Sequence, residues 1–298
     1  MIRIVTDTSA NLRKEDTERL GIAVIPMFYY DDDAEMSCMD IDAFDDTIYY
    51  ALIKKGKKIG TSQITPQRYE DFFRPYLEQG EDLLYIGMSS GISGSFDASQ
   101  SAVKSLREEF PDRFIAALDT RGASLGEGLI VLEAAKIAGE MALFGGEKED
   151  PKELYRRLLE LRKCMYQVFV VDDLMHLKRT GRLSGGSALV GTLLSIKPVL
   201  KGNRKGQIVV SKSVRGRKKA IQELTDRYNM LVQNPENQTV GIAYAACRED
   251  AELLRDQLMK IHPPKDVMMV KYEPVTGSHV GPGALALFFF GDSEVRTK

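Results

Sequence analysis

The chain has 298 residues and a formal net charge of −2, from 41 basic and 43 acidic side chains. This length suits one large domain or two domains of average size. The balanced charge gives no general attraction to nucleic acid or to anionic membranes. The longest apolar run, 284–290, is too short to span a bilayer, which takes ~20 residues.

The cysteine content excludes two further classes of protein. Cys38, Cys164 and Cys247 lie far apart, and no C-x-x-C pair occurs. The sequence therefore indicates neither a disulfide framework nor a zinc site, and we expect no metal. The first ten residues lack the basic start and the long apolar core of a signal peptide. We expect a cytoplasmic protein.

Strand and helix patterns alternate through the first half of the chain. Apolar, β-branched segments predict strands at 2–6, 22–30, 83–86 and 114–118. Helical patterns lie at 14–20, from a capping Asp42 to residue 55, and at 66–77, 96–109 and 129–143. The acidic run 31–33 fits a solvated turn better than a metal site. This alternation is typical of an α/β domain with a largely parallel sheet.

The second half follows a turn-rich, charged segment at 145–151, which is the best candidate for a linker. It predicts helices at 152–163, 187–196, 217–231 and 249–261, and strands at 167–173, 240–245, 267–272 and 284–290. Segments 197–200 and 207–214 flank a Gly-rich turn and predict a β-hairpin. We therefore predict two α/β domains: residues 1–150, with a largely parallel sheet and flanking helices, and residues 151–298, with a mixed sheet that contains the hairpin.

The segment 84–105 combines the features of an anion-binding loop. An apolar strand runs into a loop rich in glycine and serine, and a helix follows from about residue 96. Backbone N–H groups and the positive end of the helix dipole at such a point suit an anion. In α/β proteins, ligands bind beyond the carboxyl ends of the strands. We expect the loop to lie at that edge of the first sheet.

A second polar segment precedes the next predicted helix along the chain. Thr65 and Pro66 make a good N-cap and a good first helical residue. Thr61, Ser62 and Gln63 have no such structural role. They form either an ordinary hydrogen-bonded loop or part of a ligand site.

Common nucleotide and metal motifs do not occur in the sequence. No G-x-x-x-x-G-K-[ST] P-loop is present, and Gly126 and Gly128 lack the third glycine of a dinucleotide fingerprint. The three histidines are not spaced with carboxylates as metal ligands. We therefore expect no cofactor.

One pattern favours an enzyme. Residues 87–91 match the G-x-S-x-G elbow of α/β-hydrolases, and Asp172 or Asp173 and then His279 follow in the order acid, histidine. Several residues separate this loop from its helix, however, and no HGGG-type segment precedes it. A serine hydrolase with Ser89 as nucleophile stays open as the alternative function.

Five segments, in this order, resemble the DegV family. They are GTSQITP (60–66), IGMSSGISGSFDASQSA (86–102), DTRGASLGEG (119–128), LKRTGRLSG (177–185) and GSHVGPGALALFFFG (277–291). The opening IVTDTSANL is also similar, so the resemblance covers essentially the whole chain. Thr180 departs from it, because a small residue, usually glycine, is expected there. The characterised members of this family are the fatty-acid-binding (FakB-type) subunits of a bacterial fatty acid kinase, with a two-domain DegV/EDD fold.

The resemblance implies that this chain binds a long-chain fatty acid in an apolar tunnel and is not itself an enzyme. It implies that Thr61 and Ser93 hold the carboxylate, with Ser62, the Gly94 N–H and His279 nearby. A separate kinase subunit then brings ATP and converts the carboxylate into an acyl phosphate for phospholipid synthesis. The bound fatty acid is the implied ligand, no nucleic acid is implied, and a transient contact with a membrane surface is compatible with this role.

The resemblance also implies that Arg179 and His279 assist the kinase reaction or the docking of the kinase. Taken alone, Arg179 fits a surface charge and His279 fits a structural histidine better than a functional role. We call residues 197–219, which contain many Lys and Arg and no acidic residue, the basic segment. It fits a solvated face or a partner-docking surface better than a nucleic-acid contact, given the net charge. We expect Arg179 and the basic segment to face the kinase.

Overall fold

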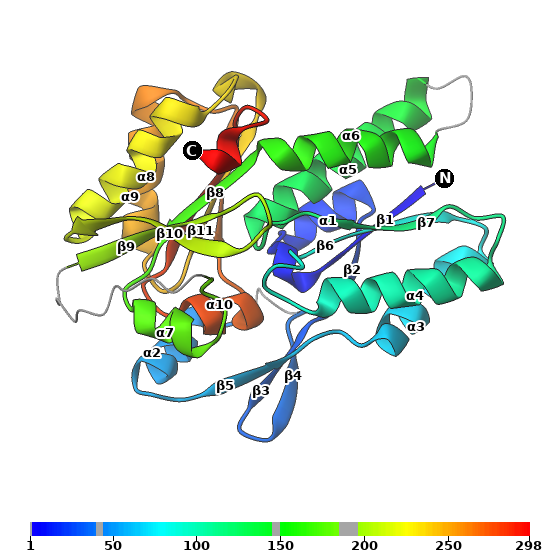
Figure 1. Ribbon diagram of the computed structural model, residues 1–298, viewed down its shortest axis with the longest axis horizontal. Coiled ribbons are helices and arrows are strands. Elements are labelled where there is room, and N and C mark those ends of the chain that lie inside the picture. Colours follow the sequence, from blue (N-terminus) through cyan, green and yellow to red (C-terminus); the bar gives the residue numbers. More distant parts are fainter. Residues whose placement is uncertain (1, 40–43, 145–149, 185–195) are drawn as a thin grey trace.

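The computed structural model describes residues 2–39, 44–144, 150–184 and 196–298. Its first sheet has four parallel strands in the order β2-β1-β6-β7 (Figure 1). The strands are β1 (Ile2–Asp7), β2 (Ala23–Ile25), β6 (Asp82–Gly87) and β7 (Ile115–Asp119). Alternate residues of β6 enter different buried clusters, Leu83 and Tyr85 on one face and Leu84 and Ile86 on the other. The predicted parallel sheet is therefore confirmed and is covered on both faces, as parallel sheets require.

The first half of the chain contains the helices α1 (Lys14–Leu20), α2 (Asp46–Lys54), α3 (Pro66–Glu78), α4 (Ser95–Glu109) and α5 (Leu125–Phe144). Helices α3, α4 and α5 cover this sheet. On one face, Phe73 of α3 and Leu106 of α4 pack into the same cluster as Leu83. On the other face, Leu129 and Ile130 of α5 pack with Leu84.

The second sheet has six strands in the order β10-β9-β8-β13-β11-β12. They are β8 (Met165–Val170), β9 (Ile196–Gly202), β10 (Ile208–Arg215), β11 (Thr239–Tyr244), β12 (Asp266–Lys271) and β13 (Leu285–Phe290). Only β11 and β12 pair in parallel, so the predicted mixed sheet and its β9–β10 hairpin are confirmed. The remaining helices are α6 (Pro151–Cys164), α7 (Leu174–Arg179), α8 (Arg217–Leu231), α9 (Arg248–Ile261) and α10 (Pro274–Val280), with short 3-10 turns at Thr8–Ala10, Pro235–Asn237 and Val295–Thr297.

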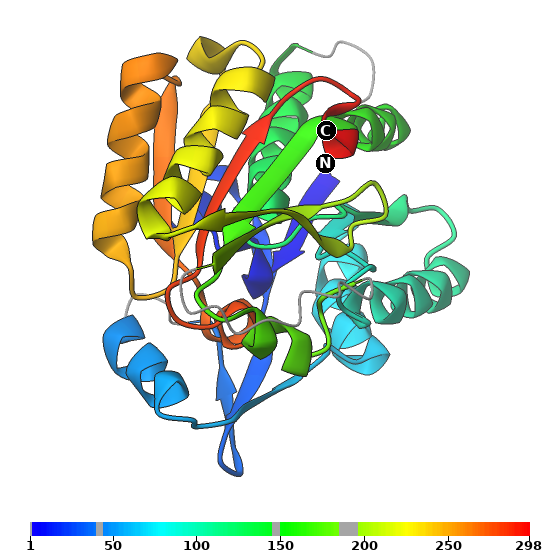
Figure 2. The same cartoon turned by 60° about the vertical axis from the view of Figure 1, so that its left-hand side comes forward.

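Helix α5 lies between the two sheets. It contacts β1 and β6 of the first sheet and β8, β11 and β13 of the second, while α8 and α9 lie on the far side of the second sheet (Figures 1 and 2). The largest buried cluster accordingly includes Leu84 and Leu129 as well as Phe169 and Phe288. The two halves share this core, and the domain boundary at residue 150 stays a prediction.

The prediction of one strand over 22–30 was wrong in one respect, because Pro26 and Met27 separate two strands. Strand β3 (Phe28–Asp31) leaves the parallel sheet and pairs with β4 (Ala34–Ser37) and β5 (Ile59–Ser62) in a small antiparallel sheet. Proline removes a ladder donor, so a strand tends to end there. This change of sheet matters for the site, since it places Thr61 of β5 opposite Tyr29.

Two predicted helix starts can be compared with the structure. The Thr65 hydroxyl accepts the Arg68 N–H at 3.3 Å, which confirms it as the N-cap of α3. The cap of α2 is Asp45, whose carboxylate accepts the Ile48 N–H at 3.0 Å. The prediction of Asp42, which lies outside the described residues, as that cap was wrong, because the carboxylate of Asp45 caps the first turn of α2. The predicted helix 187–196 lies almost wholly outside the described residues.

A buried acidic pair joins the carboxyl end of β1 to α5. The Ser9 hydroxyl lies between the carboxyl groups of Asp7 and Glu127, 2.9 Å from Glu127 Oε2. Asp7 also accepts the Ser9 N–H at 2.8 Å and the Tyr85 hydroxyl at 2.5 Å. Both acids are fully buried, and burial raises the pKa of each, that of Glu127 well above its ordinary 4.5.

The hydrogen-bond geometry identifies which acid keeps a proton. A hydroxyl has a single proton to donate, so Ser9 serves one carboxylate, and the other carboxyl group must supply its own proton to bond with Ser9. Asp7 receives the larger number of donors, which favours its charged form. Within the described residues, Glu127 has only the hydroxyls of Ser9 and Thr6 as partners and is therefore the protonated acid.

We predict that Glu127→Gln keeps the fold, because the amide replaces the O–H donor with an N–H donor of similar shape. Glu127→Ala should lose about 1 kcal/mol of stability for each hydrogen bond removed, and more for the cavity that the side chain leaves, although the Ser9 and Thr6 hydroxyls keep Asp7 and the Ile86 carbonyl oxygen as partners. Because the folded-state pKa is raised, the wild type binds more protons folded than unfolded above pH 4.5. Its free energy of unfolding should therefore fall relative to that of Glu127→Gln as the pH rises, by about 1.4 kcal/mol per pH unit at most.

Urea unfolding of the three proteins between acidic and alkaline pH measures this difference. A difference between wild type and Glu127→Gln that does not change with pH would show that Glu127 is ionised in the folded protein.

Candidate functional site

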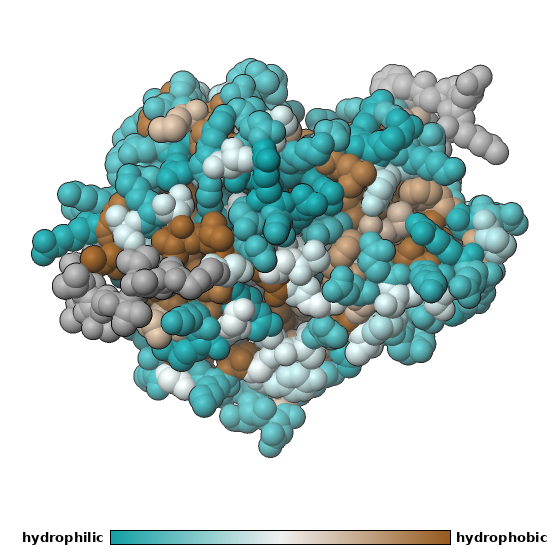
Figure 3. Space-filling view, viewed as in Figure 1, coloured by the Kyte–Doolittle hydropathy of each residue, from teal (hydrophilic) through white to brown (hydrophobic). Residues whose placement is uncertain are grey.

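A cavity of about 300 Å³ opens where the two sheets, the β9–β10 hairpin and α10 meet. Its polar lining consists mainly of Thr61, Ser62, Gln63, Ser93, Gly94, Arg182 and His279. Its apolar lining includes Met27, Met88, Ile92, Phe169, Leu177, Ile208, Val275 and Phe288. All five residues predicted to hold a carboxylate thus line one cavity; their role stays a prediction. Figure 3 shows hydrophobic residues reaching the surface toward the middle of this face, within a mostly hydrophilic periphery.

The contact between Thr61 and His279 joins residues from the two ends of the chain. Thr61 Oγ1 lies 3.0 Å from His279 Nε2. Thr61 is on β5, and His279 is on α10, a helix that the sequence did not predict. Helix α10 begins because the Glu273 carboxylate accepts the N–H groups of Val275 at 2.5 Å and Thr276 at 2.6 Å. This cap outweighs the low helix propensity of a Gly- and Ser-containing segment.

Two buried polar atoms of the cavity lining have no hydrogen-bond partner among the described residues. They are Ser62 Oγ and His279 Nδ1. An unpaired buried polar atom costs about 1–3 kcal/mol, so such atoms normally have a partner in the functional state. Because both atoms belong to residues that line the cavity, a polar group bound there would provide their missing hydrogen-bond partners.

The Gly/Ser loop reaches the cavity at the start of α4. Gly94 is the N-cap of this helix, and the Ser93 hydroxyl accepts the Ser95 N–H at 3.2 Å. A Cβ atom at Gly94 would lie 2.2 Å from Gln63 Oε1, so a larger residue there would have to displace the Gln63 side chain. Gln63, which had no role in the sequence, packs against Gly94. The two predicted polar loops therefore form one wall, with the N-terminus of α4 turned to the cavity.

Ser89 does not have the surroundings of a nucleophile. It is fully buried, and its hydroxyl donates to the carbonyl oxygen of Gly206 at 2.8 Å. The two acids of the hydrolase pattern have other partners: Asp172 pairs with Lys197 at 2.7 Å, and Asp173 caps α7 by accepting the Met175 N–H at 2.8 Å. The serine hydrolase alternative finds no support in this geometry.

Of the two arginines in the L-K-R-x-G-R segment, the structure places the second at the cavity. Arg182 lines it, and burial lowers the pKa of its guanidinium group. Arg179 does not line it: its side chain is 62% exposed and lies 3.2 Å from Asp173. Arg182 was missed because the spacing of the two arginines does not tell which one points inward. Thr180, the departure from the family pattern, bonds to the Leu177 carbonyl oxygen at 2.9 Å.

His279 is a neutral imidazole in this environment. Burial lowers its pKa to about 3, and the nearby positive charge of Arg182 acts in the same direction. His279 therefore acts here as a neutral donor or acceptor of hydrogen bonds and not as a cation. The neutral ring and the Thr61 hydroxyl have two protons between them, and their mutual hydrogen bond uses one. One proton is left to donate to a ligand, from Nδ1 or from Thr61.

Two general features accompany the site. None of the helices in the described ranges is long and apolar enough to cross a membrane. Within the same residues, no group of three or more His, Cys, Asp or Glu side chains is arranged to hold a metal ion.

Comparison with known proteins places the whole chain in one group of relatives. A family model described as an uncharacterised protein of the DegV family matches residues 1–292. A DegV domain-containing protein of Clostridium perfringens is 36% identical over 295 residues, which cover 98% of each chain. A fatty-acid-binding DegV family protein from Thermus thermophilus superposes with a TM-score of 0.85 at 27% identity, over 97% of this chain and 99% of that chain. A fatty-acid-binding DegV family protein from Streptococcus agalactiae gives a TM-score of 0.82 at 28% identity, over 98% and 99%.

We predict that the His279 imidazole of the ligand-free protein stays neutral between about pH 5 and 8, the range in which an unperturbed histidine changes its charge. The side-chain NMR signals of His279, assigned with a His279→Gln variant, should not shift across this range. A titration midpoint near the ordinary value of 6.5 would contradict the buried site. Because the unfolded chain takes up this proton and the folded protein does not, His279 should reduce stability as the pH falls below 6.5 toward 3.

Proposed function

The chain belongs to the DegV family, and we propose that it binds a long-chain fatty acid in the cavity and presents the carboxylate to a separate, ATP-dependent kinase subunit. In this proposal the protein works in the cytoplasm as a FakB-type subunit, and the acyl phosphate enters phospholipid synthesis. The observation that carries it is the meeting of Thr61, Ser62, Ser93, Gly94 and His279 in the lining of one cavity that also has many apolar side chains.

The polar residues of the cavity lining match the hydrogen-bonding requirements of a carboxylate. A carboxylate only accepts hydrogen bonds, and the wall offers hydroxyl groups, the start of α4 and the spare proton of the Thr61–His279 pair. The two unpaired atoms, Ser62 Oγ and His279 Nδ1, lie among these groups. The start of α4 adds the favourable end of a helix dipole. These features support a bound anion of one or two oxygens rather than a neutral head group.

The remaining walls suit an acyl chain. They are formed by aliphatic and aromatic side chains such as Met27, Ile92, Phe169 and Phe288. Burying a chain of about 16 carbons yields a gross gain of ~12 kcal/mol, at ~0.8 kcal/mol per CH₂, before ordering costs. The tail therefore supplies the affinity, and the head groups fix the position of the carboxylate.

Neutral donors also suit a carboxylate that must react. A bidentate arginine would engage both oxygens, whereas hydroxyl and N–H donors hold the group and leave one oxygen for in-line attack on a γ-phosphate. Phosphoryl transfer depends mainly on positioning and on stabilising the charge that develops. Arg182, at the edge of this set, is the cation best placed to do so; Arg179 is exposed and suits a contact with the partner.

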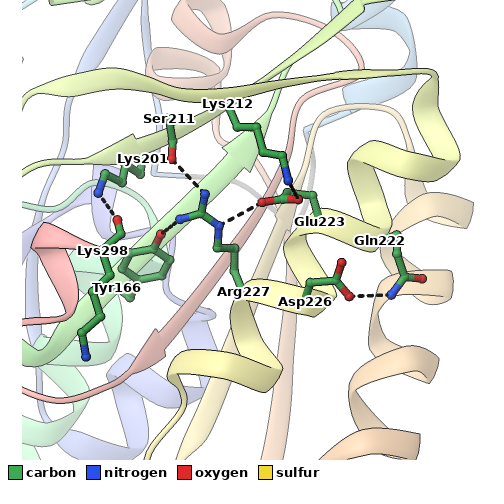
Figure 4. Close-up of polar contacts among 9 residues, drawn as sticks. All are labelled: Tyr166, Lys201, Ser211, Lys212, Gln222, Glu223, Asp226, Arg227 and Lys298. Carbon is green, nitrogen blue, oxygen red and sulfur yellow. Dashed lines mark hydrogen bonds and ion pairs between the residues drawn. The ribbon is translucent and has the colours of Figure 1, made fainter.

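Only part of the basic segment is free to dock a partner. Lys212 pairs with Glu223 of α8 at 2.6 Å, within the network of Arg227 shown in Figure 4. Arg215, Lys218 and Lys219 are exposed and have no ion-pair partner in the part of the chain that the structure describes. We propose that these three cations, with Arg179, face the kinase subunit.

We predict that Ser93→Ala and Thr61→Val reduce acyl phosphate formation by the kinase about tenfold or more, because each removes a hydrogen bond to a charged group. Fatty acid retention should change little, since the tail supplies the affinity. Mass spectrometry of denatured, purified protein measures retention, and a coupled kinase assay measures turnover. Ser101→Ala is the matched control, because it removes an exposed hydroxyl group from α4, the helix that follows Ser93. It should change neither turnover nor fatty acid retention.

Two outcomes would count against the binding site itself. One is an extract without fatty acid from protein that cannot be loaded with it afterwards. The other is equal binding of a free fatty acid and its methyl ester, because the ester lacks the charge that the head groups are expected to hold.

We predict separately that Arg179→Glu and Arg215→Glu weaken coupling to the kinase and leave fatty acid binding intact, because both side chains lie outside the cavity lining. Titration of the kinase with each variant should raise the concentration needed for half-maximal turnover. Lys260→Glu on α9, also exposed, is the control for a simple change in net charge. Loss of bound lipid in either variant would show a structural role instead of docking.

A further inference from the structure

A second pocket, of about 290 Å³, lies where the β9–β10 turn, the end of α6 and the C-terminal 3-10 turn come together. Its lining is strongly positive. Five of its residues are cations, namely Arg121, Arg162, Lys163, Arg204 and Arg296, and one, Glu294, is acidic. The function proposed for the first cavity does not use this cluster.

Two of the five cations have acidic partners. Lys163 pairs with Glu160 at 2.6 Å, and Arg204 pairs with Glu294. When these two ion pairs are set aside, three guanidinium groups remain around one pocket.

The other three arginines, across the described ranges, have no carboxylate within 4.0 Å. They donate instead to backbone carbonyl oxygens. Arg121 donates to Arg204 O at 2.8 Å, and Arg162 donates to Asp119 O at 2.7 Å. Arg296 donates to Arg121 O at 2.7 Å. Carbonyl oxygens satisfy the donors but do not neutralise the charges.

The three charges crowd one another. Arg296 is only 4% exposed, and its burial together with the neighbouring Arg121 lowers its pKa to about 10. The same two causes lower the pKa of Arg162. In addition, Arg162 Nε is buried and has no hydrogen-bond partner among the described residues. The Asp119 carboxylate acts in the opposite direction on both pKa values but forms no ion pair with either arginine. A buried charge without a paired counter-ion is costly, so an anion in the pocket would stabilise this cluster.

A purely structural role explains only part of the cluster. Arg296 holds the C-terminal turn against carbonyl oxygens of the β7–α5 loop, which accounts for its position. That role does not require Arg121 and Arg162 beside it, nor a donor of Arg162 without a partner. An acceptor-rich anion in the pocket would neutralise all three groups.

We propose that this pocket binds a phosphate-type oxyanion, held by Arg121, Arg162 and Arg296. Planar guanidinium groups are suited to tetrahedral oxyanions, because they offer paired N–H donors and a permanent charge. The volume corresponds to about ten water molecules of liquid, which is room for a phosphate group and part of what it is attached to. The site does not depend on the fatty acid proposal.

Isothermal titration calorimetry of the full chain with phosphate tests this proposal. The ionic strength is kept constant, because salt screens exposed charges, and chloride replaces phosphate in the reference titration. We expect saturable binding of inorganic phosphate to the wild type. Arg121→Gln and Arg162→Gln should each weaken it about tenfold or more. Arg113→Gln is the matched control, because Arg113 is exposed and likewise donates to a carbonyl oxygen, that of Gly80 at 2.7 Å. It should leave binding unchanged.

Arg162→Lys keeps the positive charge but lacks the paired N–H donors, so it should weaken phosphate binding less than Arg162→Gln does. This comparison of two variants at one position shows whether the loss of binding follows the charge or comes from poor folding. Titrations with inorganic triphosphate and with ATP distinguish the source of the phosphate group. Tighter binding of ATP than of triphosphate identifies a nucleotide as the ligand, and the reverse identifies a free phosphate. Absence of saturable phosphate binding, or equal weakening by Arg113→Gln, would overturn the proposal.

Discussion

The site depends on one constraint, which is that α10 must sit against β5 although more than 200 residues separate them. Side chains from the first half of the chain meet this constraint by bonding to the backbone around α10. The Tyr49 hydroxyl donates to Pro274 O at 2.8 Å, and the Tyr50 hydroxyl donates to Tyr272 O at 3.0 Å. Asn11 donates to Lys271 O at 2.7 Å. These buried contacts fix the backbone just before the helix that carries His279.

The same constraint explains the chemistry of the site. Because α10 is held against the first half of the chain, His279 is buried and stays neutral, and its partner is a hydroxyl group rather than a carboxylate. Glu273, the acid that precedes α10, is occupied in capping this helix. The fold thus keeps negative protein charge away from the place where an anionic ligand is proposed to bind.

Much of the fold follows from local patterns in the sequence. Helices α1 and α8 begin and end at the predicted residues, and the parallel and mixed sheets follow from the order of strands and helices. Helix α10 could not be predicted this way, because its segment is rich in Gly and Ser and its formation depends on the Glu273 cap and on contacts from Tyr49 and Tyr50. Pro26 marks the place where strand 22–30 divides, but the pattern on both sides suits a strand, so the sequence does not show that the second part joins another sheet.

The two serines of the Gly/Ser loop differ in what surrounds them, and only the structure separates their roles. Gly206, with φ +74°, faces Ser89 so closely that a Cβ atom would lie 2.0 Å from its hydroxyl oxygen. Ser89 therefore serves to lock the β9–β10 turn over the cavity. Ser93, four residues later, is at the start of α4 and lines the cavity. A motif that places both serines in one loop cannot show this difference, because it arises from a glycine more than a hundred residues away in the chain.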